Sequence, residues 1–324
     1  MKRVKRIFVC LLALTMMLGL SATAFAAGGE TTPTDQENVT IKKVYKLKND
    51  KTISPAETFT LEQLSSKVTD GEATGAPALG TITGASFEKG AATVNGATGD
   101  ITVALPEYTS VGVYEYTLKE VNNKTAGVTY RKDNIRLVVT VVNGSNGKLR
   151  IAAVHTETAD GTKSDTFENT YSAGTLNVSK TVTGNLGDKD KDFEFKVTLT
   201  GVEGETYADS YDVTGSPNTE NPTTIAIDKT TTFKLKHGDT IHIANLPYGV
   251  TYTVTETAAA DYTTTKTGDT GTINAADQTA AFTNSKTGTV DMGVYLDNLP
   301  YILVFAGVLA IAAVFVVRRR RFED

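Results

Sequence analysis

The chain has few of the residues from which enzymatic and metal sites are built. Of its 324 residues, none is tryptophan, three are histidine and one is cysteine. That cysteine, Cys10, lies within the apolar N-terminal segment, so an exported chain cut after this segment has no thiol and no disulfide. Such a protein must gain its stability from another source.

The absence of catalytic motifs excludes several functions. The sequence has no phosphate-binding loop, nucleophile elbow or catalytic cluster. His237 and His242 flank a Gly-Asp turn without an apparent third ligand, so we interpret H-G-D-T-I-H as a hairpin turn rather than a metal site. We expect no metal, no cofactor and no action on external substrates. The formal net charge is −5, with basic residues concentrated at the two ends, and nothing indicates nucleic-acid binding.

The N-terminus is typical of a secretory signal peptide over residues 1–26. Basic residues at Lys2 to Arg6 precede an apolar run, and Ala24-Phe25-Ala26 then supplies a small-x-small cleavage site. We expect cleavage between Ala26 and Ala27. An uncleaved N-terminal membrane anchor is the alternative, although the apolar run is short for one.

The C-terminus predicts a membrane anchor. Residues 299–317 form a continuous apolar run long enough to cross a bilayer as a helix. The basic tail, residues 318–324, begins with four arginines that favour the cytoplasmic side. The body between the two ends is therefore expected outside the membrane.

The body has the pattern of an all-β protein. It is rich in Thr, Val and Tyr, with short alternating runs separated by Gly, Asn and Asp turns, which favours β-sandwiches. The segment I-R-L-V-V-T-V-V-N-G-S-N-G-K-L-R-I-A-A-V predicts a hairpin with its turn at residues 143–147. One segment, T-L-E-Q-L-S-S-K-V at residues 60–68, is expected to form a short helix.

A boundary near residues 172–174 divides the body into two parts, each large enough for its own core. The first predicted domain spans residues 39–172 and the second spans 174–286. A flexible polar leader at 27–38 precedes them, and a tether at 287–298 follows.

Each predicted domain repeats one pattern of polar residues on an apolar strand face. Lys43 lies on the inward face of a first strand, V-T-I-K-K-V-Y-K-L, and Asn169 on that of a last strand, T-F-E-N-T-Y. Lys180 in L-N-V-S-K-T-V and Asn284 in A-A-F-T-N-S-K repeat the arrangement. Because lone lysines are rarely buried, the repetition suggests covalent chemistry between lysine and asparagine.

An inward carboxylate accompanies each pair. Glu120 shares a face with apolar residues in V-Y-E-Y-T-L-K-E, and Glu256 does so in T-Y-T-V-T-E. A lysine attacks an amide carbon only when neutral, and burial lowers a lysine pKa while raising a glutamate pKa. A neutral glutamate can then polarise the asparagine amide and relay a proton as ammonia leaves. Each residue alone also fits an ordinary structural role at the end of a strand.

In order along the chain, K-T-V-T-G-N, D-F-E-F-K-V-T-L, F-K-L-K-H-G, N-L-P-Y-G-V-T-Y-T-V-T-E and F-T-N resemble the C-terminal domain of T-antigen-type backbone pilins of Gram-positive sortase-assembled pili. The first predicted domain resembles the streptococcal pilin isopeptide-linkage domain. The resemblance covers nearly all of the exported chain. It implies two tandem immunoglobulin-like (CnaB-like) sandwiches with self-formed Lys–Asn bonds. The implied sets are Lys43, Glu120 and Asn169, and Lys180, Glu256 and Asn284.

The tail departs from the family pattern at the sorting motif. Relatives have a V-P-T-G or L-P-x-T-G type sequence, whereas this chain has V-D-M-G at residues 290–293. Either a dedicated sortase cuts between Met292 and Gly293, or the site has decayed and the protein stays a membrane-anchored stalk. The family also implies an acceptor lysine near the last strand of the first domain. Lys163 occupies that region, and an ordinary solvated loop lysine is the alternative.

The resemblance implies a structural shaft subunit of a cell-wall-anchored pilus, extracellular in its final form, with a membrane-anchored precursor. The implied partners are a class B or C pilin sortase, neighbouring pilin subunits and peptidoglycan, with host surface ligands as further candidates. A wall- or membrane-anchored adhesin or accessory pilin that is not polymerised is the alternative, although no larger head domain is visible.

Overall fold

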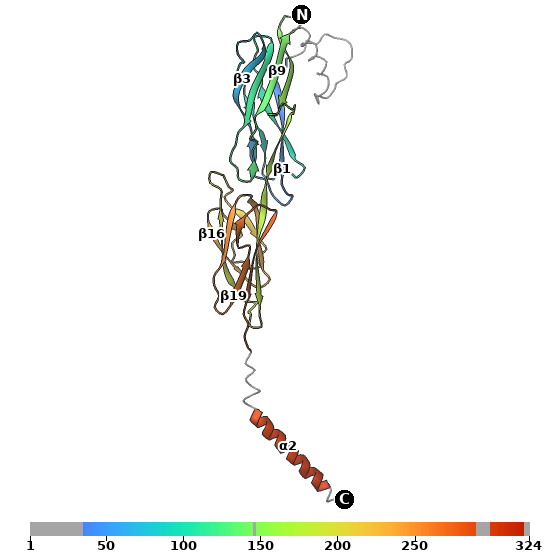
Figure 1. The fold of residues 1–324 in the computed structure, drawn as a ribbon, viewed down its shortest axis with the longest axis vertical. Helices are drawn as coiled ribbons and strands as arrows, with labels where there is room; N and C mark the ends of the chain where they lie inside the picture. The colour runs from blue at the N-terminus through green and yellow to red at the C-terminus, as the bar shows by residue number, and fades with distance from the viewer. Residues whose placement is uncertain (1–34, 145–146, 290–298, 321–324) are drawn as a thin grey trace. The chain divides into compact units, whose positions relative to one another are not determined.

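The computed structural model describes residues 35–144, 147–289 and 299–320. Within these ranges the chain forms two β-sandwiches and one helix (Figure 1). The expected all-β architecture with two sandwiches is therefore confirmed. The predicted signal peptide with its cleavage site at Ala26 and Ala27, and the predicted sorting residues Met292 and Gly293, lie outside the described residues.

The first sandwich consists of a five-stranded sheet, a four-stranded sheet and a separate strand pair. The five-stranded sheet has the order β4-β6-β1-β11-β8, formed by β4 (Ile82–Thr83), β6 (Ala97–Ala104), β1 (Asn38–Leu47), β11 (Thr166–Tyr171) and β8 (Val128–Thr129). The four-stranded sheet has the order β10-β9-β7-β3, formed by β10 (Leu149–Glu157), β9 (Ile135–Asn143), β7 (Gly112–Glu120) and β3 (Leu61–Gly71). The separate pair is β2 (Glu57–Phe59) with β5 (Ala85–Phe87).

The second sandwich consists of a six-stranded and a four-stranded sheet. The six-stranded sheet has the order β15-β14-β17-β12-β21-β19, formed by β15 (Thr224–Ile225), β14 (Tyr211–Thr214), β17 (Thr240–Pro247), β12 (Ala173–Thr183), β21 (Asp277–Ser285) and β19 (Thr263–Thr267). The four-stranded sheet has the order β16-β13-β18-β20, formed by β16 (Thr230–Leu235), β13 (Phe193–Thr200), β18 (Thr251–Glu256) and β20 (Thr270–Thr272).

Alternation of apolar and polar residues along the strands produces both cores. In β9, Ile135, Leu137 and Val139 are buried while the residues between them are partly exposed. In β13 the same alternation buries Phe193 and Phe195. Because successive side chains of a strand point to opposite faces, each sheet has one face available for its sandwich core.

The first and last strands of each sandwich lie side by side and run parallel. β1 pairs with β11 in the first sandwich, and β12 pairs with β21 in the second. These pairs join segments more than 100 residues apart in the sequence. Lys43 is the register partner of Phe167, and Lys180 is the register partner of Phe282. This pairing places the predicted lysines and asparagines on neighbouring strands.

Two local predictions are wrong for the same reason. Residues 60–68 do not form a helix but belong mainly to strand β3, which pairs with β7. The H-G-D-T-I-H turn is not a hairpin, because β16 and β17, which it connects, belong to different sheets. In both cases tertiary pairing overrides a local pattern. The predicted hairpin of β9 and β10 is confirmed by their antiparallel pairing from Asn143↔Leu149 onward.

The histidines of that turn have separate protein partners. His237 Nδ1 accepts a hydrogen bond from the backbone N–H of Val182 at 3.0 Å. His242 Nδ1 lies 2.6 Å from the side-chain oxygen of Asn177. Each imidazole therefore supports strand β12 at a different position.

The C-terminal apolar segment forms helix α2 (Leu299–Arg320), drawn in red in Figure 1. Among the described residues, no helix meets the combined length and hydropathy that a membrane crossing requires.

Candidate functional site

The first candidate site begins with a buried lysine and a buried asparagine on adjacent strands. In the parallel register of β1 and β11, Lys43 lies opposite Phe167 and Tyr45 lies opposite Asn169. Lys43 and Asn169 are therefore diagonal neighbours, two positions apart, on the same inward face. Each is only 2% exposed.

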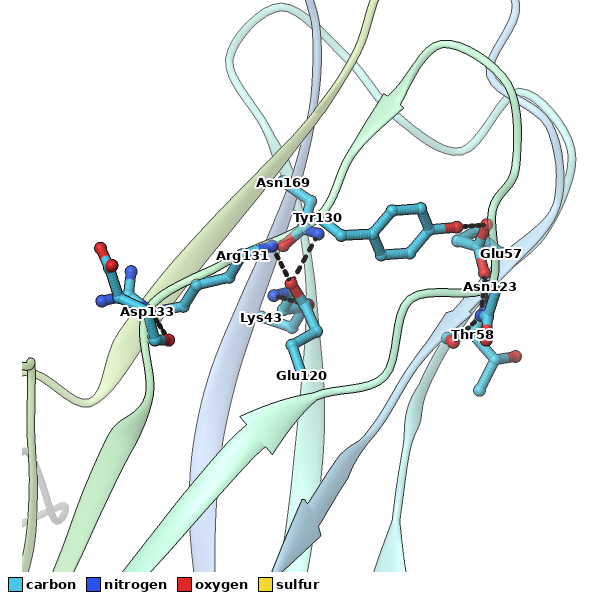
Figure 2. A network of polar contacts seen from close by, with 9 residues as sticks. All are labelled: Lys43, Glu57, Thr58, Glu120, Asn123, Tyr130, Arg131, Asp133 and Asn169. Atoms are coloured by element: carbon cyan, nitrogen blue, oxygen red, sulfur yellow. Dashed lines mark hydrogen bonds and ion pairs between the residues drawn. The ribbon is translucent and has the colours of Figure 1, made fainter. Parts of the chain in front are cut away.

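Glu120 reaches this pair from the opposite sheet. It is the last residue of β7, and it is also 2% exposed. Lys43 Nζ donates to Glu120 Oε1, and Asn169 Nδ2 donates to Glu120 Oε2 at 3.0 Å (Figure 2). The backbone N–H of Arg131 donates to the same Oε2 at 2.5 Å. One carboxyl group thus bridges the amine and the amide.

The surroundings of Lys43 lower its pKa on balance. Burial lowers the pKa of Lys43; Glu120 opposes this shift, and the positive charge of Arg131 adds to it. The Phe59 ring centroid lies 5.0 Å from Lys43 Nζ, a cation–π contact that favours the charged form and so acts against this lowering. A lysine that spends time neutral is a potential nucleophile.

The second candidate site has the same construction. Lys180 on β12 lies opposite Phe282, and Val182 lies opposite Asn284 on β21, which gives the same diagonal relation. Lys180 is 1% exposed and Asn284 is fully buried. The register of the two parallel strand pairs is therefore identical in the two sandwiches.

Glu256, at the end of β18 in the opposite sheet, completes the second set. Lys180 Nζ donates to both carboxyl oxygens of Glu256, at 2.8 Å and 2.9 Å, and Asn284 Nδ2 donates to Oε1 at 2.5 Å. Burial lowers the pKa of Lys180, and Glu256 opposes the shift. The Phe193 ring centroid lies 4.2 Å from Lys180 Nζ.

The amide oxygens of both asparagines have no hydrogen-bond partner. Among the described residues, Asn169 Oδ1 and Asn284 Oδ1 are buried acceptors without a donor. A buried polar atom without a partner costs free energy, so its presence in a native structure requires an explanation, and a catalytic role is one. Rotating either amide by 180° would exchange oxygen and nitrogen and bring the oxygen to the glutamate. A protonated glutamate could then donate to it.

Sequence reasoning found the six polar residues of the two sets but missed two residues near the first set, Arg131 and Glu57. It did not find Arg131, because its contribution to Glu120 is a backbone N–H that any residue except proline supplies. It also missed Glu57, although Glu57 and Phe59 share a buried face of β2. A carboxylate alternating with phenylalanine was a signal that could have found it.

The other predicted residues lie away from these sites. Lys163 is exposed in the loop between β10 and β11, where it forms an isolated backbone bridge with Glu157. Lys46, which is not one of the predicted site residues, lies on the outward face of β1, and its Nζ donates to Glu168 Oε1 at 2.7 Å. The start of the tether is attached to the second sandwich, because Asn185 Nδ2 donates to the carbonyl oxygen of Gly288 at 2.7 Å.

Comparison with known proteins agrees with this architecture. Residues 39–172 match the family model described as a Spy0128-like isopeptide containing domain, and residues 174–286 match a domain of unknown function. A curated pilin of Streptococcus pyogenes serotype M1 is 29% identical over 339 aligned residues, which cover 94% of this chain and 98% of that protein. A pilus tip adhesin of the same species, Cpa, is 35% identical over 118 residues, 16% of its length.

A solved structure gives the same result. The crystal structure of the major pilin from Streptococcus pyogenes matches with a TM-score of 0.53 and 26% identity, over 78% of this chain and 99% of that one. The fold and the paired sites define a structural protein of two tandem immunoglobulin-like sandwiches. The first sandwich is a Spy0128-like isopeptide containing domain, and the chain is homologous to the streptococcal major pilin along most of its length. It is therefore a shaft subunit of a cell-surface pilus, in which its partners are other pilin subunits.

Proposed function

We propose that each sandwich of this pilin closes itself with a covalent Lys–Asn isopeptide bond, formed without another enzyme. The observation that carries the proposal is the repeated geometry. In both sandwiches a buried lysine and a buried asparagine are diagonal neighbours on parallel strands. Both side chains are hydrogen-bonded to one glutamate from the opposite sheet. A purely structural role for either set does not explain why both share one register.

The reaction balances within each set of three residues. In the first, Lys43 passes one proton to Glu120, and the neutral Nζ attacks Cγ of Asn169. The protonated carboxyl donates to the amide oxygen and stabilises the charge that develops on it. As the C–N bond to the amide nitrogen breaks, protons from the lysine nitrogen move through Glu120 to the leaving group. The products are a secondary amide and ammonia, and no cofactor enters.

The isopeptide bonds would stabilise a chain that has no disulfide after removal of the signal peptide. Each bond links the first and last strands of its sandwich and so closes a loop of roughly 100 residues or more, for which the chain-entropy estimate gives about 5 kcal/mol. Unlike a disulfide, an amide is not broken by reduction. We therefore assign to the chain no catalysis other than this intramolecular reaction.

For assembly, we propose that a membrane sortase cuts between Met292 and Gly293. The apolar run at residues 299–317, which the sequence predicts to be a membrane anchor, and the basic tail would hold the precursor at the membrane until this cut, while the sandwiches stand outside. The acyl group would then pass to Lys163 of another subunit, or to peptidoglycan. The exposed loop position of Lys163 suits an acceptor amine. The competing possibility is an uncut, membrane-anchored stalk.

Intact-mass measurement tests the internal bonds directly. The recombinant body, residues 27–286, is expected to lack two ammonias relative to its sequence. Peptide mass spectrometry should assign one cross-link to Lys43 and Asn169 and the other to Lys180 and Asn284. Glu120→Ala and Glu256→Ala should each restore one ammonia. A wild-type body of full unmodified mass refutes the proposal.

The same measurement should show whether bond formation requires the folded chain. Both bonds are expected to form in the folded chain and not in strong denaturant, because only the core brings the amine, amide and acid together. Formation at equal speed in denaturant would contradict a reaction that the core directs.

A further inference from the structure

A second buried carboxylate lies beside the first set of residues and has no part in the proposed reaction. Glu57 is 6% exposed, at the start of β2. Its Oε2 accepts from the Tyr130 hydroxyl at 2.6 Å, and its Oε1 accepts from Asn123 Nδ2 at 2.6 Å and from the Thr58 N–H at 3.0 Å. Among the ion pairs of the described residues, none involves Glu57. Neutral donors alone hold this carboxylate.

The contact with Tyr130 leads through the backbone to the reaction site. Tyr130 is buried, and its ring packs against Phe59 with centroids 6.0 Å apart. The next residue, Arg131, donates its backbone N–H to Glu120 Oε2 at 2.5 Å. Figure 2 shows Tyr130 extending toward Glu57 while the nitrogen of Arg131 faces Glu120.

The side chain of Arg131 is turned away from the reacting groups. Its Nε donates to the Asp133 carbonyl oxygen at 3.1 Å, and its guanidinium carbon lies 4.9 Å from the centroid of the Phe167 ring. These contacts hold Arg131 from one side, and the bond between Tyr130 and Glu57 holds the segment from the other. The Arg131 N–H that donates to Glu120 is therefore held in position by contacts of its own side chain and of the preceding residue, Tyr130.

We propose that Glu57 is a positioning residue for the first cross-link, which anchors Tyr130 and thereby holds the Arg131 N–H against Glu120. The inference rests on the proposed isopeptide function. With Oε2 held by this N–H, the carboxyl stays aligned between Lys43 and Asn169. A misplacement of about 1 Å in such a constellation can slow a reaction by roughly 100-fold.

The second sandwich provides an internal comparison. Glu256 accepts hydrogen bonds from Lys180 and Asn284, and in the described part of the chain no backbone N–H donates to it. Its reaction therefore does not depend on Glu57. The two bonds of one molecule can be timed against each other.

The test is a pulse-chase of the full-length chain in cell-free translation. Samples are quenched at intervals, and peptide mass spectrometry measures the Lys43–Asn169 and Lys180–Asn284 cross-links separately. Glu57→Ala and Tyr130→Phe are expected to slow the first bond by roughly tenfold or more, because the carboxyl loses its alignment. The second bond should form at the wild-type rate in both variants.

Two further variants separate positioning from general stability. Glu57→Gln keeps an oxygen that can accept from Tyr130, although its amide nitrogen cannot accept from Asn123 and the Thr58 N–H as Oε1 does. It should therefore form the first bond at least about threefold faster than Glu57→Ala, but more slowly than the wild type. Val139→Ala removes core volume from the first sandwich without touching these contacts. It should slow the first bond by less than about twofold, because it lowers stability and leaves the alignment of reacting groups intact.

The outcomes are distinct. If the wild type forms both bonds and Glu57→Ala forms the first one equally fast, the positioning role is refuted and the isopeptide function stands. The positioning role is also refuted if Val139→Ala slows the first bond as much as Glu57→Ala, or if Glu57→Gln fails to rescue it. If the wild type forms neither bond, the proposed function falls and this inference falls with it.

Discussion

Replacing Asn169 by alanine removes the first cross-link and leaves the rest of its site in place. Lys43 and Glu120 remain paired in the variant, so no charge is left buried alone. The change also removes a buried amide oxygen that has no donor. Asn169→Ala is therefore a cleaner perturbation than replacing the lysine or the glutamate.

The expected loss of stability follows from the loop that the bond closes. The bond joins β1 to β11, which span nearly the whole first sandwich. For a loop of roughly 125 residues the chain-entropy estimate is about 5 kcal/mol. With an unfolding entropy of about 2.1 cal/mol/K per residue over roughly 135 residues, this corresponds to a fall of about 18 °C in the Tm of the first sandwich.

Differential scanning calorimetry of the recombinant body measures this fall. Only the transition of the first sandwich should move, and the intact mass should rise by one ammonia. Asn284→Ala should produce the equivalent shift in the second sandwich. Asn221→Ala is the matched control, because Asn221 is also buried and hydrogen-bonded but belongs to neither set. It should lose about 1–3 kcal/mol and leave the mass deficit unchanged.

Two results would refute this reasoning. One is an Asn169→Ala protein that unfolds at the wild-type temperature although its mass shows that the bond is missing. The bond would then contribute nothing to stability. The other is a Tm loss no larger than that of Asn221→Ala, which would assign the effect to lost polar contacts alone.

Three other changes test the remaining claims. In Glu120→Ala, Lys43 loses the partner that raises its pKa, so its folded-state pKa lies further below the unfolded value of about 10.4. The unfolded chain then binds more protons between these pKa values, and urea denaturation at pH 7, 8 and 9 should show stability rising by up to about 1.4 kcal/mol per pH unit. This slope should vanish when Lys43→Met is added, and a flat profile in Glu120→Ala itself contradicts a buried, depressed lysine. In the native host, Lys163→Ala should leave single subunits on the cell wall and abolish the ladder of covalent multimers in denaturing gels; an undiminished ladder identifies another acceptor. Gly293→Ala should leave uncut monomer in the membrane fraction, and normal processing of this variant places the cut elsewhere.

Sequence alone could predict the polar residues on each strand face because a strand has a period of two. Lys43, Asn169, Lys180 and Asn284 each interrupt an otherwise apolar face, and this is visible without a structure. The sequence segments that resemble pilin domains, found along both predicted domains, then indicated the fold. Local patterns failed at residues 60–68, where the propensity of a short segment was weaker than its pairing with β7.

The tertiary structure alone decided which groups meet. Residues far apart in sequence are brought together by the parallel pairing of β1 with β11, and a periodic pattern contains no information about such a register. The arrival of Glu120 from the opposite sheet, and its contact with the backbone of Arg131, depend on how two sheets pack. The sequence therefore determined which side chains point inward, and only packing across the core determined which of them could react.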